Sequence, residues 1–209
     1  MQLFLERQHE FFIDGPEGQI EAVIDGCPKG IRGVAIVCHP HPLYAGTMHN
    51  KVAHTLARAY RDSNIAAIRF NFRGVGQSSG SYGDGDGEVE DLRAVYQWLE
   101  AQAVDVPVYL AGFSFGSMVA ARGCEFVKPC HLTVVAPPAG KYQYPKSFCA
   151  PALLMQGTED EVCDAQDAFD WAESLSTPIE VEVFDGGSHF FHGALTDLKR
   201  RLMTHLAEV

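Results

Sequence analysis

The sequence is short of basic residues, with 16 Lys and Arg against 27 Asp and Glu and a net charge of −11 at pH 7. Proteins that bind nucleic acids gather Lys and Arg on one face, where these side chains meet the phosphates. We therefore expect no nucleic-acid partner. An acidic balance of this size is more often a source of solubility than the sign of a specific cationic partner.

Paired cysteines, long apolar runs and linkers are missing as well. The N-terminal MQLFLERQHEFF contains glutamates and no sustained apolar stretch, which argues against a signal peptide or membrane span and favours a cytoplasmic location. Because no repeat or linker interrupts the chain, residues 1–209 are expected to form a single α/β domain. Six cysteines without a CxxC pair are expected to be free thiols: Cys27, Cys38, Cys124, Cys130, Cys149 and Cys163.

What is present is an alternation of apolar, strand-like runs with segments of helical periodicity. The loop Asp14–Gly18 is rich in turn formers, so the first two runs are expected to form an antiparallel hairpin. Later runs are separated by enough residues for crossover helices, which predicts a parallel sheet covered on both faces. The strands are predicted at about 9–13, 19–25, 33–38, 65–70, 106–111, 131–135, 152–156 and 179–184, and the helices at about 47–61, 88–101, 115–124, 164–175 and 191–207.

One pentapeptide, Gly112-Phe113-Ser114-Phe115-Gly116, falls between a predicted buried strand and a predicted helix. A sharp strand-to-helix turn forces its central residue into strained backbone angles, and glycines two positions away avoid collisions with strand and helix. The hydroxyl of Ser114 is then expected to project at the carboxyl edge of the sheet. This placement makes Ser114 the candidate nucleophile.

In these features the chain resembles the α/β-hydrolase superfamily, from the first hairpin to the last helix. It looks most similar to small lidless bacterial hydrolases with a His-Pro-His-Pro segment after the third strand, here His39–Pro42, and an Arg-Gly-x-Gly-x-Ser segment after the fourth, here Arg73–Ser78. The resemblance implies an eight-stranded, mostly parallel sheet with helices on both faces. The irregular stretch Pro137–Ala150 is too short for a cap domain.

A serine hydroxyl needs a histidine to accept its proton and a carboxylate to orient that histidine. The resemblance implies the order serine, acid, histidine along the chain. It points to Asp160 as the acid, with Glu159 and Asp164 as rivals. It points to His189 as the base, with His192 as a substitute that is expected to lie in the last helix.

The charge on the tetrahedral intermediate calls for two backbone N–H donors. Phe115, directly after the nucleophile, is the first candidate. Prolines at positions 40 and 42 remove two donors from the loop after Cys38. By alignment with the family pattern, His41 is the second candidate, with Leu43 as the alternative.

Two other classes of function stay open from the sequence. His39 and His41 could serve a metal-dependent hydrolase, although His49 and His54 do not complete a convergent ligand set. A catalytically silent binding protein on the same fold is the other alternative. No P-loop or dinucleotide-binding motif is present, so no cofactor is expected, and the lack of a convergent ligand set argues against a metal.

The first expectation is a carboxylesterase acting on a small-molecule acyl substrate, then a thioesterase, then a peptidase. All three use the same triad, and the difference between them lies in the pocket. The sequence makes no prediction of the oligomeric state. Apolar side chains that could line an acyl site are Leu43, Tyr44, Phe113, Phe115 and the aromatic residues of Tyr142–Phe148.

Overall fold

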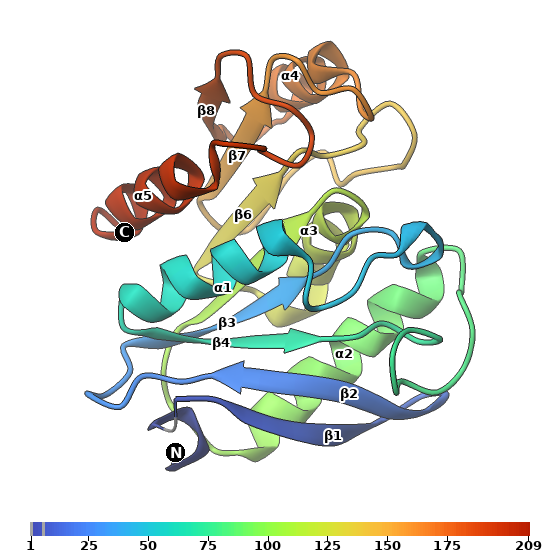
Figure 1. Ribbon diagram of the computed structural model, residues 1–209, viewed down its shortest axis with the longest axis vertical. Coiled ribbons are helices and arrows are strands. Elements are labelled where there is room, and N and C mark those ends of the chain that lie inside the picture. The colour runs from blue at the N-terminus through green and yellow to red at the C-terminus, as the bar shows by residue number, and fades with distance from the viewer. Residues whose placement is uncertain (1, 6) are drawn as a thin grey trace.

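The computed structural model describes residues 2–5 and 7–209, which build one eight-stranded sheet with strand order β1-β2-β4-β3-β5-β6-β7-β8 (Figure 1). Strand β2 pairs antiparallel with both β1 and β4, and every later pairing is parallel. The predicted sheet and its strands are confirmed, with end shifts of no more than two residues. The strands are β1 (His9–Gly15), β2 (Gly18–Asp25), β3 (Gly33–Cys38), β4 (Ile65–Phe70), β5 (Val108–Phe113), β6 (His131–Val135), β7 (Ala152–Gly157) and β8 (Glu180–Phe184).

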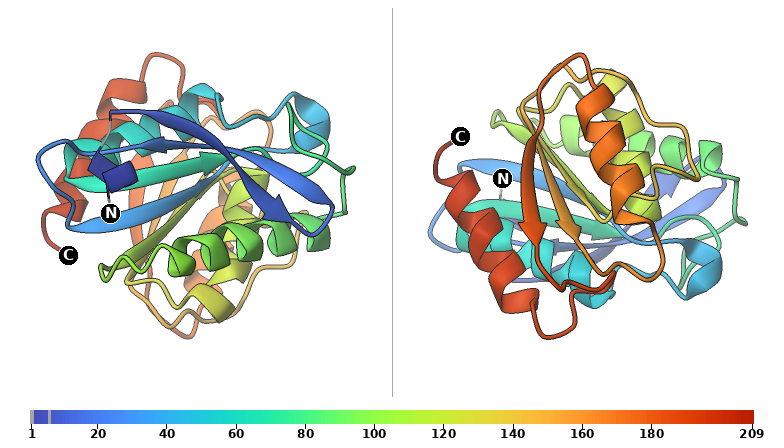
Figure 2. Two further views of the ribbon diagram at one scale, coloured as in Figure 1. Left: turned by 90° about the horizontal axis from the view of Figure 1, so that it is seen from below. Right: turned by 90° about the horizontal axis from the view of Figure 1, so that it is seen from above.

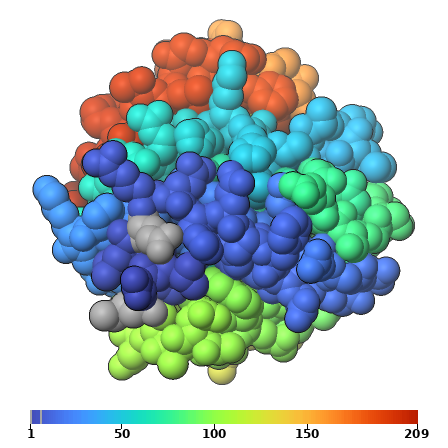
Figure 3. Space-filling view, turned by 60° about the horizontal axis from the view of Figure 1, so that its bottom comes forward, coloured from blue at the N-terminus to red at the C-terminus, as the bar shows by residue number. Residues whose placement is uncertain are grey.

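The N-terminal hairpin forms as predicted, with Gly15 opposite Gly18 at its turn and His9 opposite Ile24 at its open end. Gly18 has a φ of 114°, a value that L side chains rarely adopt, so glycine suits this turn. The hairpin occupies the outer edge of the sheet and dominates the face seen in Figure 3. It lies beyond β4, on the side of the sheet opposite β7 and β8.

Within the described part of the chain, five helices cover the two faces of the sheet, with α1 and α5 on one face and α2, α3 and α4 on the other (Figure 2). Short 3-10 helices η1 (Gln2–Leu5) and η2 (Pro42–Tyr44) complete the elements. Among the described residues, no helix has the length and apolar character that crossing a membrane requires. The helices are α1 (Lys51–Asp62), α2 (Asp86–Ala101), α3 (Phe115–Val127), α4 (Ala165–Ser174) and α5 (Leu195–Leu206).

Two helices, α1 and α5, begin four residues later than predicted. Helix α1 begins at Lys51 rather than near residue 47, since the Asn50 side chain accepts hydrogen bonds from the first free backbone N–H groups. Helix α5 begins at Leu195, so His192 lies in the preceding turn. The expectation that His192 belongs to the last helix is therefore wrong.

The core consists of two apolar layers, one on each side of the sheet. Alternate residues of the central strands serve opposite layers: Ile36 and Leu110 face α2 and α3, whereas Val37 and Ala111 face α1 and α5. Strands β3 to β7 are therefore buried on both faces, which explains their continuous apolar runs. Their carboxyl ends meet at one edge of the sheet, and the loops after β3, β5, β7 and β8 meet there.

Candidate active site

Ser114 is the single residue between the end of β5 and the start of α3. Its backbone has φ 53° and ψ −125°, a strained conformation for a residue with a side chain. The Ser114 N–H donates to the Val135 carbonyl at 2.8 Å, and the Ser117 N–H donates to the Ser114 carbonyl at 2.8 Å. These bonds hold the turn in the conformation that the sequence predicts.

Both flanking glycines are required by close backbone approach. A Cβ on Gly112 would lie 2.1 Å from the Gly116 carbonyl oxygen, inside the turn itself. A Cβ on Gly116 would lie 2.4 Å from the Cys38 carbonyl oxygen and 2.3 Å from that of His39. The first turn of α3 therefore packs directly against the loop that leaves β3.

Three side chains from three loops form a continuous hydrogen-bonded chain. The His189 Nδ1–H donates to Asp160 Oδ2 at 2.8 Å, and Ser114 Oγ lies 3.1 Å from His189 Nε2. The side chains of His189 and Asp160 are 2% and 0% exposed. The structure thus brings together the three residues that the sequence analysis selects, although 75 positions separate Ser114 from His189.

Both oxygens of the Asp160 carboxylate accept hydrogen bonds from other groups besides His189. Its Oδ1 accepts the N–H groups of Val162 at 2.9 Å and Cys163 at 2.7 Å, and Gln156 Nε2 donates to Oδ2 at 3.2 Å. Burial raises the pKa of Asp160, but the hydrogen bonds from His189 and the backbone outweigh burial, so the pKa lies below its ordinary value. Asp160 is therefore an ionised partner for His189 at neutral pH.

Neither rival acid occupies an equivalent position. Asp164 is exposed, and its side chain caps α4 by accepting the Gln166 N–H at 2.9 Å. Glu159 is exposed as well, and its backbone N–H donates to the Gly187 carbonyl. Of the three carboxylates, Asp160 is the one that bonds the histidine ring.

The His189 loop is fixed by contacts on several sides. The Glu161 carboxylate accepts the His189 backbone N–H at 2.9 Å, and this bond holds the pKa of Glu161 below its usual range. The rings of Phe113 and Phe190 each lie 5.0 Å from the imidazole, centroid to centroid. His192, the substitute base, is exposed. Glu161 is a residue of the site that the sequence did not indicate, although its position directly after Asp160 is a signal for it.

The loop after β3 is pinned by His39, which is fully buried. Its Nδ1–H donates to the Pro40 carbonyl at 2.6 Å, and its Nε2 accepts the Phe72 N–H at 3.0 Å. Burial lowers the pKa of His39 to about 3, so the ring is neutral. Since the backbone occupies both nitrogens, His39 has no lone pair to offer a metal ion, which argues against the metal-dependent alternative.

His41 and Leu43 follow in the same loop. The Leu43 N–H already donates to His41 Nδ1 at 3.2 Å, which favours His41 over Leu43 as the residue whose backbone N–H is free for a substrate. The His41 ring lies 4.7 Å from that of Phe115. Phe115 is the first residue of α3, where backbone N–H groups lack partners within the helix.

The residues predicted to line an acyl site differ in their exposure to solvent. Phe113 and Phe115 are 0% and 1% exposed and belong to the core on opposite faces of the sheet. Leu43 and Tyr44 are 65% and 83% exposed at the tip of the β3 loop. Tyr142 lies half-buried against Phe115, with ring centroids 5.6 Å apart.

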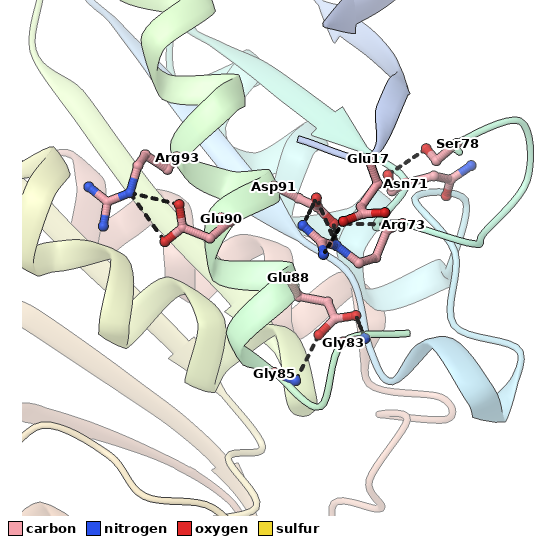
Figure 4. Close-up of polar contacts among 10 residues, drawn as sticks. All are labelled: Glu17, Asn71, Arg73, Ser78, Gly83, Gly85, Glu88, Glu90, Asp91 and Arg93. Atoms are coloured by element: carbon pink, nitrogen blue, oxygen red, sulfur yellow. Dashed lines mark hydrogen bonds and ion pairs between the residues drawn. The ribbon is translucent and has the colours of Figure 1, made fainter. Parts of the chain in front are cut away.

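The Arg73–Ser78 segment has a structural role (Figure 4). The Arg73 guanidinium pairs with the buried Asp91 of α2 at 2.8 Å, and the Arg73 backbone N–H donates to the same carboxylate. The Ser78 hydroxyl donates to the Asn71 carbonyl at 2.7 Å. Together these bonds close the connection between β4 and α2.

Cys163 is a further residue at the site for which the sequence gives no signal. Its side chain is 4% exposed, and its sulfur lies within 4.8 Å of an Asp160 carboxylate oxygen and of a His189 ring nitrogen. Burial raises the pKa of the Cys163 thiol to about 12, and the Asp160 charge acts in the same direction. The side chain is therefore a neutral thiol at physiological pH.

The chain is similar to known proteins both in sequence and in structure. A family model described as an alpha/beta hydrolase domain matches residues 43–208. The chain is 32% identical to an uncharacterised protein of Rickettsia prowazekii, over 96% of this chain and 89% of that protein. Each of these comparisons covers most of the chain.

Two solved structures share the fold closely. An α/β serine hydrolase without a lid from Xanthomonas campestris has a TM-score of 0.91 and 40% identity, covering 99% of this chain and 96% of that one. An α/β serine hydrolase homologue from Coxiella burnetii also has a TM-score of 0.91, with 43% identity, covering 95% and 97%. The lidless relative agrees with the prediction that no cap domain is present.

Proposed function

The chain belongs to the α/β-hydrolase family, and we propose that it hydrolyses a carboxylic ester through an acyl-enzyme formed on Ser114. The observation that carries the proposal is the hydrogen-bonded chain from Ser114 through His189 to Asp160, which is the arrangement that nucleophilic acyl transfer requires. Three separate loops converge on it. A structural network would not need a serine in a strained turn at its end.

In the proposed reaction, His189 Nε2 removes the proton from Ser114 Oγ as the oxygen attacks the ester carbonyl. The imidazolium is stabilised by the ionised Asp160 at Nδ1. Collapse of the tetrahedral intermediate breaks the carbonyl–alkoxy bond, and His189 returns the proton to the leaving alcohol. Water then attacks the acyl-enzyme by the same steps, releasing the acid and restoring Ser114.

The negative charge of each tetrahedral intermediate would be stabilised by the backbone N–H groups of Phe115 and His41. The contact of Gly116 with the Cys38 and His39 carbonyls supports this pairing, because it brings the β3 loop beside the first turn of α3. Each such donor typically contributes about 3–4 kcal/mol to the transition state. The His39 bonds would keep the loop rigid and the donor in place.

An ester of a small acyl group fits the surroundings of Ser114 best. The segment between β6 and β7, residues 136–151, contains no helix or strand that could form a cap. The nearby apolar surface of Leu43 and Tyr44 is open to solvent. Such a site favours substrates that need little enclosure.

The test is covalent labelling with a fluorophosphonate probe, followed by rates on p-nitrophenyl esters of increasing chain length. We expect labelling of the wild type and of Ser174→Ala, whose exposed serine lies on α4, and no labelling of Ser114→Ala. Acyl thioesters and an aminopeptide assayed in parallel rank the three bond types. A well-folded wild type that neither takes up the probe nor cleaves any ester would refute the proposal.

A further inference from the structure

We propose that a cavity beside the His189 loop binds the alcohol part of the ester, and that it selects alcohols carrying an anionic group. The inference rests on the function proposed above, because it names the substrate class of the same site. It concerns binding and specificity and leaves the chemical step unchanged.

The cavity lies between the segment that leads into α1 and the segment that leads into α5. Its volume is about 460 Å³, which is within the usual range for small-molecule sites. Thr47 and Val52 line it from the α1 side, and Phe190 and Leu195 line it from the α5 side. Both segments start at the carboxyl edge of the sheet, where the proposed triad lies.

Phe190 connects the cavity with the proposed triad. Its ring lies 5.0 Å from the His189 imidazole, centroid to centroid, and His189 Nε2 lies 3.1 Å from Ser114 Oγ. One imidazole ring therefore separates this wall of the cavity from the nucleophile. On the α1 side, Thr47 continues the loop that carries His41, the proposed oxyanion donor.

The direction of proton transfer assigns the alcohol to this side of the site. When the first tetrahedral intermediate collapses, His189 gives a proton from Nε2 to the alcohol oxygen, so that oxygen must face the imidazole. The rest of the alcohol then extends along the His189 ring, beside which Phe190 lines the cavity. The acyl group lies on the other side of the bond that breaks.

The lining suits an apolar body that carries a negative charge. Val52, Phe190 and Leu195 provide apolar surface for the carbon skeleton of an alcohol. Lys51 and His49 provide polar groups, and no Asp or Glu is among the described residues that line the cavity. The chain as a whole has a net charge of −11, so this lining is opposite in sign to the rest of the molecule. Its charge complements an anionic group.

Lys51 carries the positive charge of the cavity. No ion pair within residues 2–5 and 7–209 includes Lys51, so its ammonium is available to a ligand. Because Lys51 is the first residue of α1, the positive end of the helix dipole adds to its charge. The Asn50 side chain already accepts the N–H groups of Val52 and Ala53, so the bond to a ligand would come from the Lys51 side chain.

The carboxylate of Glu21 acts on the second polar group, His49, from outside the lining. Glu21 Oε2 accepts a hydrogen bond from Asn71 Nδ2 at 2.7 Å and another from the Gln77 N–H at 2.8 Å. Its negative charge offsets positive charge on His49. Lys51 is therefore the residue that should determine the preference.

The test compares kcat/KM for 3-carboxyphenyl acetate and 3-carbamoylphenyl acetate, which differ in charge but hardly in shape. We expect the ratio of the anionic to the neutral ester to exceed one in the wild type and to fall by about three- to fivefold in Lys51→Gln. Lys51→Glu should bring the ratio below one, and an acidic residue in the first turn keeps α1 stable. Added salt should lower the wild-type ratio by screening.

Lys29→Gln is the matched control, because it removes the same charge from an exposed position before β3 and should keep the wild-type ratio. A wild type that prefers the neutral ester, or an unchanged ratio in both Lys51 variants, would overturn the inference. The side of the ester is tested with p-nitrophenyl hemisuccinate and p-nitrophenyl butyrate, in which the charge lies on the acyl group. If Lys51→Glu changes this second ratio and leaves the first unchanged, the assignment of the cavity to the alcohol is wrong.

A binding measurement separates this inference from the proposed function. Titration with 3-hydroxybenzoate and 3-hydroxybenzamide, followed by NMR, should show tighter binding of the anion to the wild type and a loss of that difference in Lys51→Glu. If binding behaves so but no ester is cleaved, the anionic site stands and the ester hydrolase does not. If esters are cleaved but the two alcohols bind equally well to the wild type, the site is refuted in an active enzyme.

Discussion

His39 and His189 both lie at the carboxyl edge of the sheet, but their rings bond to different kinds of partner. Both are buried histidines in loops at the carboxyl edge of the sheet, and both rings make two hydrogen bonds. The partners of His39 are a backbone carbonyl and a backbone N–H. The partners of His189 are a carboxylate and a hydroxyl.

The partners decide what each ring can do. A peptide group forms hydrogen bonds but neither releases nor takes up a proton at neutral pH. The bonds of His39 therefore fix its tautomer and anchor the loop. A serine hydroxyl can give up its proton and a carboxylate can stabilise the resulting imidazolium, so the bonds of His189 suit proton transfer. Burial alone does not distinguish a structural histidine from a reactive one.

The largest expected loss of activity follows from a substitution of His189 itself. Replacing His189 with alanine removes the group that would accept the Ser114 proton, and we expect kcat/KM for a p-nitrophenyl ester to fall by roughly 10⁶-fold. His192→Ala, a change three residues away in the same loop, should leave the rate near the wild-type value. Retention of most activity in His189→Ala would remove His189 from the mechanism.

Asp160→Asn gives His189 a neutral partner, as His39 has. The amide can still accept the backbone N–H groups of Val162 and Cys163, so the fold should persist, but the imidazolium loses its counter-charge. We expect kcat to fall by roughly 10⁴-fold. Asp164→Asn, which keeps an accepting side chain at the α4 cap, is the matched control and should be silent. Comparable rates in the two variants would contradict the role of Asp160.

Gly116→Ala tests whether the His39 loop positions Ser114 and Phe115. The new methyl group would press on the Cys38 and His39 carbonyls, and the two segments must separate. A displacement of about 1 Å at a reacting centre costs about 100-fold in rate, which we expect in kcat. Gly30→Ala, strained at φ 109° but with open space around it, separates general destabilisation from this effect. If both variants lose activity equally, the packing has no special role.

The sequence predicts Ser114 well because local patterns determine its surroundings. An apolar strand, two glycines and a helix are all visible within a few residues, and the structure confirms each of them. The order of strands also predicts that the loops carrying Asp160 and His189 reach the same edge. Both predictions use short sequence patterns and the order of the strands, which can be identified along the chain without knowledge of contacts between distant loops.

Contacts between distant loops are not visible in the same way. The bond between His39 and the Phe72 N–H joins two loops that are 33 positions apart, and no spacing rule predicts it. Cys163 lies close to His189 through the fold alone. The prediction for His192 is wrong for a different reason. The periodicity of residues 191–207 does not reveal that the chain makes turns up to Ala194 before the helix begins.

The smallest expected effect is on stability and concerns His39. Its pKa is lowered to about 3 in the folded protein, whereas the unfolded chain takes up a proton near pH 6.5. Below about pH 6.5 the unfolded state therefore binds one more proton at this residue, and stability falls as the pH decreases toward 3.

In His39→Gln, an amide that does not titrate can still accept the Phe72 N–H, so this proton uptake disappears. We expect the mutant to be less stable at pH 7 by about 1–3 kcal/mol, because the bond to Pro40 is lost or weakened. Between pH 6 and 4, its unfolding free energy should fall less steeply than that of the wild type, by about 1.4 kcal/mol per pH unit. Urea denaturation at several pH values measures both quantities. Parallel pH profiles would mean that His39 is protonated in the native state, and its role as a neutral anchor of the β3 loop would be lost.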